Sequence, residues 1–493
     1  MQPDIHTLAQ LKASGYKRRS IKTELRENLI EKLRKNEAVF EGIIGYEDTV
    51  IPDIERAILS GHSINMLGLR GQAKTRIARQ MVNLLDEYIP YVEGSEIADD
   101  PLNPVSHYAI QQIAETGGNT PIAWLHRSDR YVEKLATPDV SVADLIGDLD
   151  PVKAINLKLS YSDERAIHFG LIPRSNRCIF VINELPDLQA RIQVALFNIL
   201  QEGDIQIRGF KLRLPLDIQF VFTANPEDYT NRGSIVTPLK DRIGSQIITH
   251  YPKSIEIARS ITRQEARITP EQATMVTVPL LLENIIEQVV FEARNSEFVD
   301  AKSGVSARLS ISAYENLVSA AERRALLSGE RKTTARISDL QGIIPAITGK
   351  VEMVYEGEQE GPLNVAQNLV GKAIKAVFSE TFPPVEKPGK KNRESANPYQ
   401  EITSWFDEGQ HLDLPQMSTD KAFQKILDSL PALRNFVNAQ FPKADAAAKY
   451  LLMELLLFGL SEHSKLSKHM LERSISFRDL FGSVFSGFSD QNS

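Results

Sequence analysis

The spacing of hydrophobic residues changes along the chain, and each spacing predicts a different element. Ile21, Leu25, Leu29 and Leu33 recur every four residues among charges, which predicts an amphipathic helix over residues 20–35 that docks on another surface. Continuous apolar runs predict buried strands at residues 63–67, 121–126, 177–184, 218–225 and 246–251. Helical patterns separate several of these runs, so the sequence predicts an α/β fold with a parallel sheet.

The pattern changes again towards the C-terminus. Past residue 251 the apolar spacing is helical, and a later stretch with four prolines and few apolar residues predicts a solvated linker. Phe477, Phe481, Phe485 and Phe488 predict a last helix that packs on its own domain, with partner binding as the alternative. The predicted divisions are an N-terminal helical segment 1–39, an α/β domain 40–251, a helical domain 252–382, a linker 383–398 and a helical C-terminal region 399–493.

Charge and cysteine content limit the binding partners, the kinds of site and the cellular compartment to be expected. The 493 residues carry a net charge of -7, which gives no support for general nucleic-acid or anionic-membrane binding. The single cysteine, Cys178, excludes an internal disulfide framework and a thiolate zinc site. The polar start lacks a signal-peptide pattern, and the most apolar stretch, residues 450–460, is too short to span a bilayer. We therefore expect a cytoplasmic protein without a membrane span.

A glycine-containing loop follows the first predicted strand and precedes a helical pattern. It approximates the phosphate-binding form G-x-x-x-x-G-K-[ST]: Gly68, Lys74 and Thr75 fit, Gly71 lies inside the loop, and Ala73 replaces the second glycine. Such a loop presents backbone N–H groups and a helix N-terminus to an anion. Lys74 would reach the β- and γ-phosphates of ATP and Thr75 would bind Mg²⁺, whereas a glycine-rich turn with a chance Lys-Thr pair is the alternative.

A turn over residues 40–48 precedes this loop. It contains the paired isoleucines Ile43 and Ile44 between two glycines, and its position would let it wrap an adenine base. A plain surface turn is the alternative reading.

The strand over residues 177–184 ends in Asn183 and Glu184, the position where chemistry gathers in a parallel sheet. Glu184 has the right chemistry to polarise the attacking water. The Asn183 carbonyl can accept a bond from a water on Mg²⁺ but brings no negative charge, so we expect Mg²⁺ to be held more weakly. The alternative is a strand that merely ends in polar residues. The 110 residues from Lys74 to Glu184 exceed one crossover, which predicts an insertion.

Three later residues have the chemistry to complete a site for ATP hydrolysis. Asn225 ends the next predicted strand and could bridge the γ-phosphate and the water, although Asn-Pro is also a common turn start. Arg242 could stabilise the transition state in a neighbouring subunit, whereas a plain surface ion pair is the alternative. Arg308 begins a predicted helix and could reach back to the nucleotide, whereas most such arginines are solvated.

In this order the motifs resemble those of AAA+ ATPases of the helix-two-insert branch, which includes the magnesium and cobalt chelatase I subunits and the MoxR-type ATPases. The resemblance covers residues 40–351. The matching residues are the loop 68–75, Asn183 and Glu184 as Walker B, Asn225 as sensor one, Arg242 as arginine finger and Arg308 as sensor two. The hairpin predicted by the alternation over residues 204–214 looks like the pre-sensor insertion, and residues 140–150 and 169–173 look like the chelatase insert.

This resemblance implies an α/β P-loop NTPase (AAA+) fold with helices on both faces of the sheet, an α-helical lid domain and a helical C-terminal extension. It further implies ATP and Mg²⁺ as ligands, a homo-oligomeric ring, often a hexamer, and a partner with a von Willebrand factor A domain. The chain departs from the pattern at Asn183, where the family usually has Asp, and after residue 383, where no counterpart is apparent.

We therefore expect an ATP-hydrolysing ring protein that remodels or activates a protein partner, with metal insertion as one such activity. The first alternative is a nucleotide-gated scaffold with little hydrolysis, because of Asn183. The second is a sigma-factor-dependent transcription activator, but the chain lacks the G-A-F-T-G-A loop and the helix-turn-helix of that class.

Overall fold

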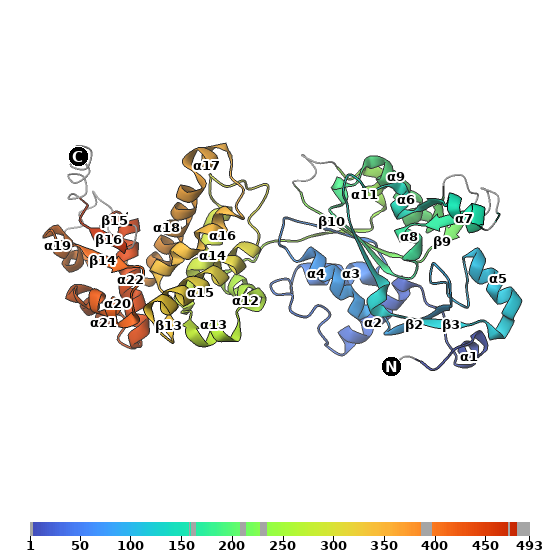
Figure 1. Ribbon diagram of the computed structural model, residues 1–493, viewed down its shortest axis with the longest axis horizontal. Helices are drawn as coiled ribbons and strands as arrows, with labels where there is room; N and C mark the ends of the chain where they lie inside the picture. The colour runs from blue at the N-terminus through green and yellow to red at the C-terminus, as the bar shows by residue number, and fades with distance from the viewer. Residues whose placement is uncertain are drawn as a thin grey trace. The chain divides into compact units, whose positions relative to one another are not determined.

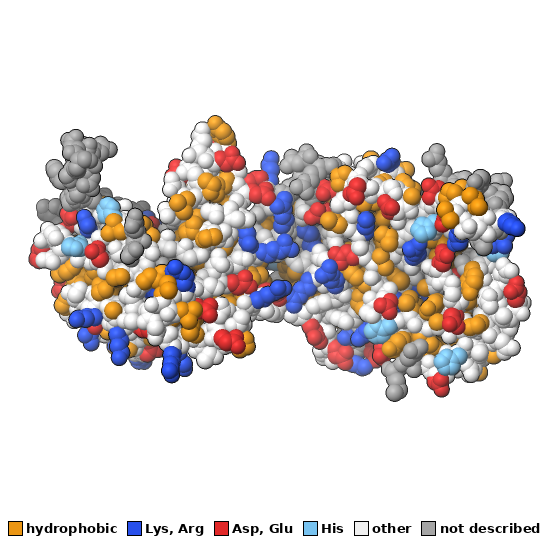
Figure 2. Space-filling view, viewed as in Figure 1, with side chains coloured by type: hydrophobic (Ala, Val, Ile, Leu, Met, Phe, Trp, Pro, Cys, Tyr) orange, Lys and Arg blue, Asp and Glu red, His pale blue; other side chains and the backbone are white. Residues whose placement is uncertain are grey.

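The computed structural model describes residues 3–156, 158, 164–207, 213–226, 234–385, 397–471 and 474–480. The chain forms two compact units, Met1–Tyr251 and Pro252–Ser493 (Figure 1). Acidic and basic side chains are mixed on the visible surface of each unit (Figure 2).

Five parallel strands form the central sheet of the first unit. They are β1 (Ile64–Leu67), β4 (Tyr131–Leu135), β7 (Ile179–Asn183), β10 (Gln219–Ala224) and β11 (Ser245–Ile248). Their order across the sheet is β11-β1-β10-β7-β4, and every neighbouring pair is parallel. The parallel α/β sheet is confirmed, and because all strands run the same way, their carboxyl ends meet at one edge. The edge strand β4 was not predicted.

Helices cover both faces of this sheet, as expected (Figure 1). Ile179 and Val181 of β7 pack in one hydrophobic cluster with residues of three helices, whereas Phe180 and Ile182 pack in a second cluster on the opposite face. The first face carries α2 (Ile21–Arg34), α3 (Val50–Leu59) and α4 (Lys74–Gln80), which the 3-10 helix η1 (Met81–Leu84) continues. The second face carries α9 (Ala190–Glu202) and α11 (Thr237–Arg242).

The predicted docking helix α2 is anchored in the first unit by an ion pair as well as by apolar contacts. Ile21, Leu25 and Leu29 are buried in the cluster beneath it. Its Glu24 accepts two hydrogen bonds of 2.7 Å from the guanidinium of Arg130, and both side chains are almost wholly buried. A bidentate pair of this kind fixes the helix in one position.

Two insertions fill the predicted gap between α4 and β7. The first comprises β2 (Tyr88–Val92), α5 (His107–Thr116), η2 (Gly117–Asn119) and β3 (Ile122–His126), and α1 (Leu8–Ala13) contacts it. The strand predicted at 121–126 is β3, but it pairs antiparallel with β2 outside the central sheet. After η3 (Arg127–Arg130) and β4, the second insertion comprises α6 (Val142–Leu145), β5 (Gly147–Leu149), α7 (Pro151–Asn156), η4 (Glu164–Ala166), β6 (Ile167–Phe169) and α8 (Leu171–Arg174).

A further hairpin precedes β10. It consists of β8 (Asp204–Gln206) and β9 (Arg213–Pro215), which pair antiparallel. The predicted hairpin is therefore confirmed at its base, and its tip around Gly209 lies outside the described residues.

The second unit is mainly helical. Its helices are α12 (Ile255–Glu265), α13 (Pro270–Met275), α14 (Leu280–Arg294), α15 (Arg308–Ser328), η6 (Ile337–Ile343), α16 (Ile344–Thr348), α17 (Tyr355–Glu360), α18 (Pro362–Thr381), α19 (Gln400–Asp407), α20 (Asp420–Asp428), α21 (Pro431–Gln440) and α22 (Ala446–Glu462). One hydrophobic cluster runs from Val276 to Phe477, so residues on both sides of the predicted linker share a core.

Short strands complete this unit. β12 (Val276–Thr277) pairs with β13 (Thr333–Thr334), and β14 (Leu412–Pro415), β16 (Ser474–Arg478) and β15 (Ser467–Met470) form an antiparallel sheet in that order. Phe477, expected in a last helix, lies in β16, and Phe481, Phe485 and Phe488 lie outside the described residues. None of the described helices is long and apolar enough to cross a membrane.

Candidate functional site

The loop between β1 and α4 is held tightly against the neighbouring strands. The Gly68 N–H donates to the Ala224 carbonyl at 3.1 Å. A Cβ on Gly68 would overlap the hydroxyl of Thr249 and the amide oxygen of Gln72, which are hydrogen-bonded to each other at 2.5 Å. Gly68 is therefore needed because no side chain fits where the strand enters the loop.

The middle of the loop uses left-handed backbone. Gly71 has φ +72° and Ala73 has φ +56°, and Ala73 immediately precedes the first residue of α4. Glycine adopts this conformation freely, whereas for a residue with a Cβ the conformation costs about 1 kcal/mol or more in conformational energy. The loop geometry thus explains why the phosphate-binding pattern has glycine at the position that Ala73 occupies.

Lys74 joins the loop to the end of β10. Its Nζ donates to the carbonyl of Leu69 at 2.9 Å and to Oδ1 of Asn225 at 2.8 Å, and also to the carbonyl of Gly68. Asn225 is only 5% exposed. Two residues predicted from separate motifs are therefore in direct contact.

The end of β7 carries a second hydrogen-bonded group. Nδ2 of Asn183 donates to Oε1 of Glu133 at 2.5 Å, and Oδ1 of Asn183 accepts from the Thr223 hydroxyl at 3.1 Å. The same hydroxyl oxygen accepts from the backbone N–H of Glu184 at 3.1 Å. Glu184 has φ +57°, a left-handed conformation that is uncommon for a non-glycine residue and that gathers at functional sites.

Glu133 connects this group to α4 and to its own strand. Its Oε2 accepts from Nη2 of Arg79 at 2.9 Å, from Nε of Arg79 at 3.0 Å and from the Tyr131 hydroxyl at 3.1 Å. Burial, followed by the charge of Glu133, raises the pKa of Tyr131, so the phenol keeps its proton and acts as a donor. Glu133, Arg79 and Thr223 were not identified from the sequence.

The turn that precedes α3 lies against the same loop. Ile43 is buried in the hydrophobic cluster of the first unit and Ile44 is partly exposed. The Tyr46 hydroxyl lies 3.1 Å from the Gln72 carbonyl and 2.7 Å from the His250 carbonyl, and burial raises its pKa to about 12. Tyr46 therefore holds the turn beside the loop. This placement is compatible with the prediction that Ile43 and Ile44 contact an adenine base, which stays a prediction.

The two predicted arginines lie elsewhere. Arg242 ends α11, donates from Nε to Gln201 at 2.9 Å, and its guanidinium carbon lies 5.3 Å from the Phe197 ring centroid. These contacts are to α9 and not to the loop. Arg308 is exposed at the first residue of α15, in the second unit.

The residues around the loop include oxygen donors that would suit Mg²⁺ bound together with a nucleotide. The described residues contain no group of three or more His, Cys, Asp or Glu side chains able to hold a metal ion. Thr75, next to Lys74, is half-buried and supplies a hydroxyl, and Asn183 supplies an amide oxygen. Mg²⁺ commonly keeps several waters and takes substrate phosphates as ligands, which needs few protein groups.

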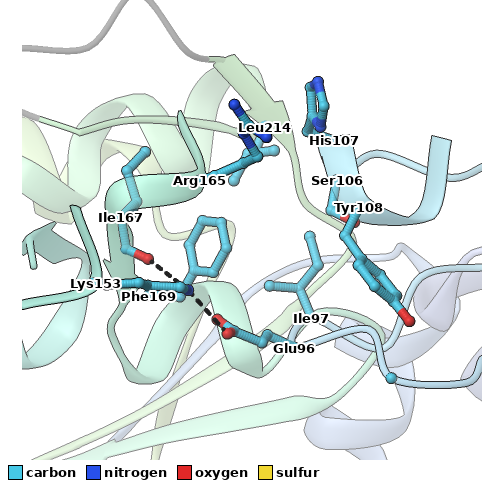
Figure 3. A pocket seen from close by; sticks show the side chains of 11 residues that line it. Glu96, Ile97, Ser106, His107, Tyr108, Lys153, Arg165, Ile167, Phe169 and Leu214 are labelled. Atoms are coloured by element: carbon cyan, nitrogen blue, oxygen red, sulfur yellow. Dashed lines mark hydrogen bonds and ion pairs between the residues drawn. The ribbon is translucent and has the colours of Figure 1, made fainter. Parts of the chain in front are cut away.

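A cavity of about 340 Å³ lies in the first unit (Figure 3). The side chains of Ile97, Ile167 and Phe169 face it, and Lys153 donates to Glu96 at 3.1 Å on its wall. None of the residues predicted to bind nucleotide lines it.

No protein-family model and no curated protein sequence match the chain. Among solved structures, it is similar to the complex of magnesium chelatase subunits BchI and BchD, with 22% identity, a TM-score of 0.35, and coverage of 65% of this chain and 98% of that chain.

Two further structures are similar. One is NtrX of Brucella abortus with ADP, with 13% identity, a TM-score of 0.37 and coverage of 71% of this chain and 66% of that one. The other is closed Hsp104 with ATPγS and FITC casein, with 14% identity, a TM-score of 0.38 and coverage of 63% and 50%. The parallel sheet, the loop after β1, helices on both faces and a helical second unit give this chain an α/β fold followed by a helical unit.

Proposed function

We propose that this protein is an AAA+ ATPase that works as a homo-oligomeric ring and uses ATP to remodel or activate a protein partner. The observation that carries the proposal is the contact between Lys74 and Asn225, which joins the phosphate-loop lysine to the polar end of β10. A buried amide and a loop ammonium at one sheet edge suit a phosphate group that both can contact.

Each residue has a role in this proposal. Lys74 binds the β- and γ-phosphates and Thr75 the Mg²⁺, which when bound neutralises charge on the phosphate oxygens. Glu184 acts as general base towards the attacking water, and Asn225 orients that water against the γ-phosphate. The left-handed backbone at Glu184 supports this role, since strained residues gather at active sites.

Arg242 serves as an arginine finger for the neighbouring subunit. Its contacts to Phe197 and Gln201 hold the guanidinium on α9, away from the loop of its own subunit. A charge fixed in this way loses little entropy when it meets a phosphate. Arg308 would act as a lid residue, and Ile43 and Ile44 would contact the adenine.

Turnover by the purified full chain tests the enzymatic part. The control is Glu184→Gln, which keeps the size of the side chain and removes the base. We expect at least a hundredfold loss of phosphate release in this variant, the usual contribution of a general base. If the wild-type rate is no higher than that of Glu184→Gln while both bind ATP, the nucleotide-gated scaffold is the correct reading.

Mixing of subunits tests assembly. Arg242→Ala and Glu184→Gln are each expected to be inactive, whereas an equimolar mixture should regain part of the activity because some interfaces combine an intact base with an intact arginine. No recovery in mixed rings would contradict the role of Arg242.

The partner follows from the resemblance to chelatase and MoxR-type proteins. A protein with a von Willebrand factor A domain is the first candidate, with metal insertion as one activity it could support. The test is capture from the native host by the Glu184→Gln variant with ATP, compared with Lys74→Ala. A partner retained equally by both variants would not depend on nucleotide and would contradict this proposal.

A further inference from the structure

We infer that Glu133 of β4 carries the negative charge that Asn183 of β7 lacks, and that Glu133 is a positioning residue for Mg²⁺-dependent nucleotide binding. This inference rests on the proposed function. It assigns a role to a residue on an edge strand, outside every motif of the sequence.

The donors and acceptors form one continuous chain. Arg79 and Tyr131 donate to one oxygen of Glu133, and the other oxygen accepts from Asn183. The amide oxygen of Asn183 accepts from Thr223, whose own oxygen accepts from the Glu184 N–H. An ionised carboxylate can only accept, so Glu133 determines that the Asn183 nitrogen faces β4 and its oxygen faces β10.

This series of hydrogen bonds explains why β7 ends in asparagine. An aspartate at 183 in the same position would place a carboxylate oxygen about 2.5 Å from the carboxylate of Glu133. Two carboxylates at such a distance cannot both ionise without a large cost. The negative charge of the pair is therefore on β4, and residue 183 supplies the matching donor.

This series of hydrogen bonds also reaches both sides of the proposed nucleotide site. On α4, Arg79 lies four residues after Thr75, so the two side chains share one face of the helix, and that face contacts Glu133. At the other end, Thr223 bonds the backbone of Glu184. Loss of the Glu133 charge would change the orientation of Asn183 and the support of the proposed base together.

The test measures the Mg²⁺ concentration that half-saturates binding of a fluorescent ATP analogue, methylanthraniloyl-ATP, to the full-length protein. Outer-shell partners usually change metal affinity by 10–100-fold when they are removed. We expect Glu133→Gln to raise the half-saturating Mg²⁺ concentration about tenfold or more, with analogue binding in EDTA unchanged. The same substitution at Glu115, exposed on α5 and bonded to Gln111, is the matched control and should have no effect.

The exchanged pair Glu133→Gln/Asn183→Asp gives the decisive comparison. Its amide and carboxylate can remake the bond in the reverse direction, so we expect the Mg²⁺ dependence to return to within about threefold of wild type, well inside the tenfold effect above. Asn183→Asp alone should lower the temperature midpoint of unfolding by about 2–4 °C, because the new carboxylate would face that of Glu133 and the two would repel.

Three outcomes would overturn the inference. They are a wild-type Mg²⁺ dependence in folded Glu133→Gln, a folded exchanged pair that recovers nothing, and unfolding of both variants, which would make Glu133 structural only. Failure of the wild-type protein to bind the analogue at all would instead contradict the proposed function. The two failures are therefore distinguishable.

Discussion

The Nζ of Lys74 lies 2.8 Å from Oδ1 of Asn225, across 151 positions of sequence. The ammonium that would bind phosphate is thus in contact with the amide that would sense it. Because phosphate oxygens are stronger acceptors than a neutral amide, a bound nucleotide would compete for Lys74 and alter the position of Asn225.

Asn225→Asp should convert this contact into an ion pair. Charge-assisted hydrogen bonds are roughly twice as strong as neutral ones, so the carboxylate would compete with the phosphates for Lys74. We expect about tenfold weaker binding of the ATP analogue, equivalent to about 1.4 kcal/mol. Titration by fluorescence measures the effect. Asn225→Ala serves as control and should lose turnover while changing affinity less, and unchanged affinity in Asn225→Asp would contradict the competition.

Ala73→Gly should stabilise the first unit. The substitution removes a Cβ from a residue at φ +56°, which relieves about 1 kcal/mol, although the greater freedom of glycine in the unfolded chain offsets part of this gain. The same substitution at Ala78, within α4 and fully buried, should have the opposite sign. Urea unfolding followed by circular dichroism compares the two variants, and a destabilised Ala73→Gly variant would show that the loop backbone is not strained there.

Arg130→Met should destabilise the first unit by roughly 3–5 kcal/mol, because it leaves the Glu24 carboxylate buried without its bidentate partner. The double variant Glu24→Met/Arg130→Met should recover much of that loss, since neither charge is then buried. The free energy of unfolding in urea measures both effects. A double variant as unstable as the single one would mean that packing, and not charge, fixes α2.

The second unit should lose stability as pH rises from about 4.5 to 7. Burial raises the pKa of Glu454 to about 7 from its ordinary 4.5, although its oxygens accept from the N–H groups of Ile337 and Ser338. The folded state therefore binds the proton more tightly than the unfolded state, so the stabilisation is complete at acid pH and is lost through pH 7. The full effect is on the order of 3 kcal/mol.

Glu287, whose pKa burial also raises to about 7, contributes with the same sign. Glu454→Gln should therefore remove about half of the pH dependence. Unfolding midpoints at pH 5 and pH 7.5 measure this difference, and an equal slope in Glu454→Gln and wild type would exclude Glu454 as the source.

The sequence predicted those strands of the sheet in which an apolar run is followed by polar or glycine residues of the candidate site. β1, β7 and β10 are mostly apolar strands that are almost wholly buried, so the sequence located their ends, and the parallel sheet brings these ends to one edge. β4 was not predicted because Glu133 and Lys134 interrupt its apolar pattern. Charged residues are tolerated there because β4 lies at the edge of the sheet.

Glu133 was missed for the same reason, since its importance comes from strand pairing. β4 aligns Leu135 with Asn183, and only this register brings the Glu133 carboxylate to the Asn183 amide. The strand order that creates the neighbourhood depends on tertiary packing, which apolar spacing does not encode. Phe477 shows the same limit, because a four-residue spacing without a partner does not distinguish a helix from β16.

The shared core of the second unit has a mechanical consequence. Phe378 of α18 occupies the space that a side chain on Gly459 of α22 would need, and its ring also lies against Tyr399 and His463. Close-packed helices of this kind transmit displacement because they cannot compress. Because α18 and α22 share this core, we expect the C-terminal helices to move together with α18 and not independently of it.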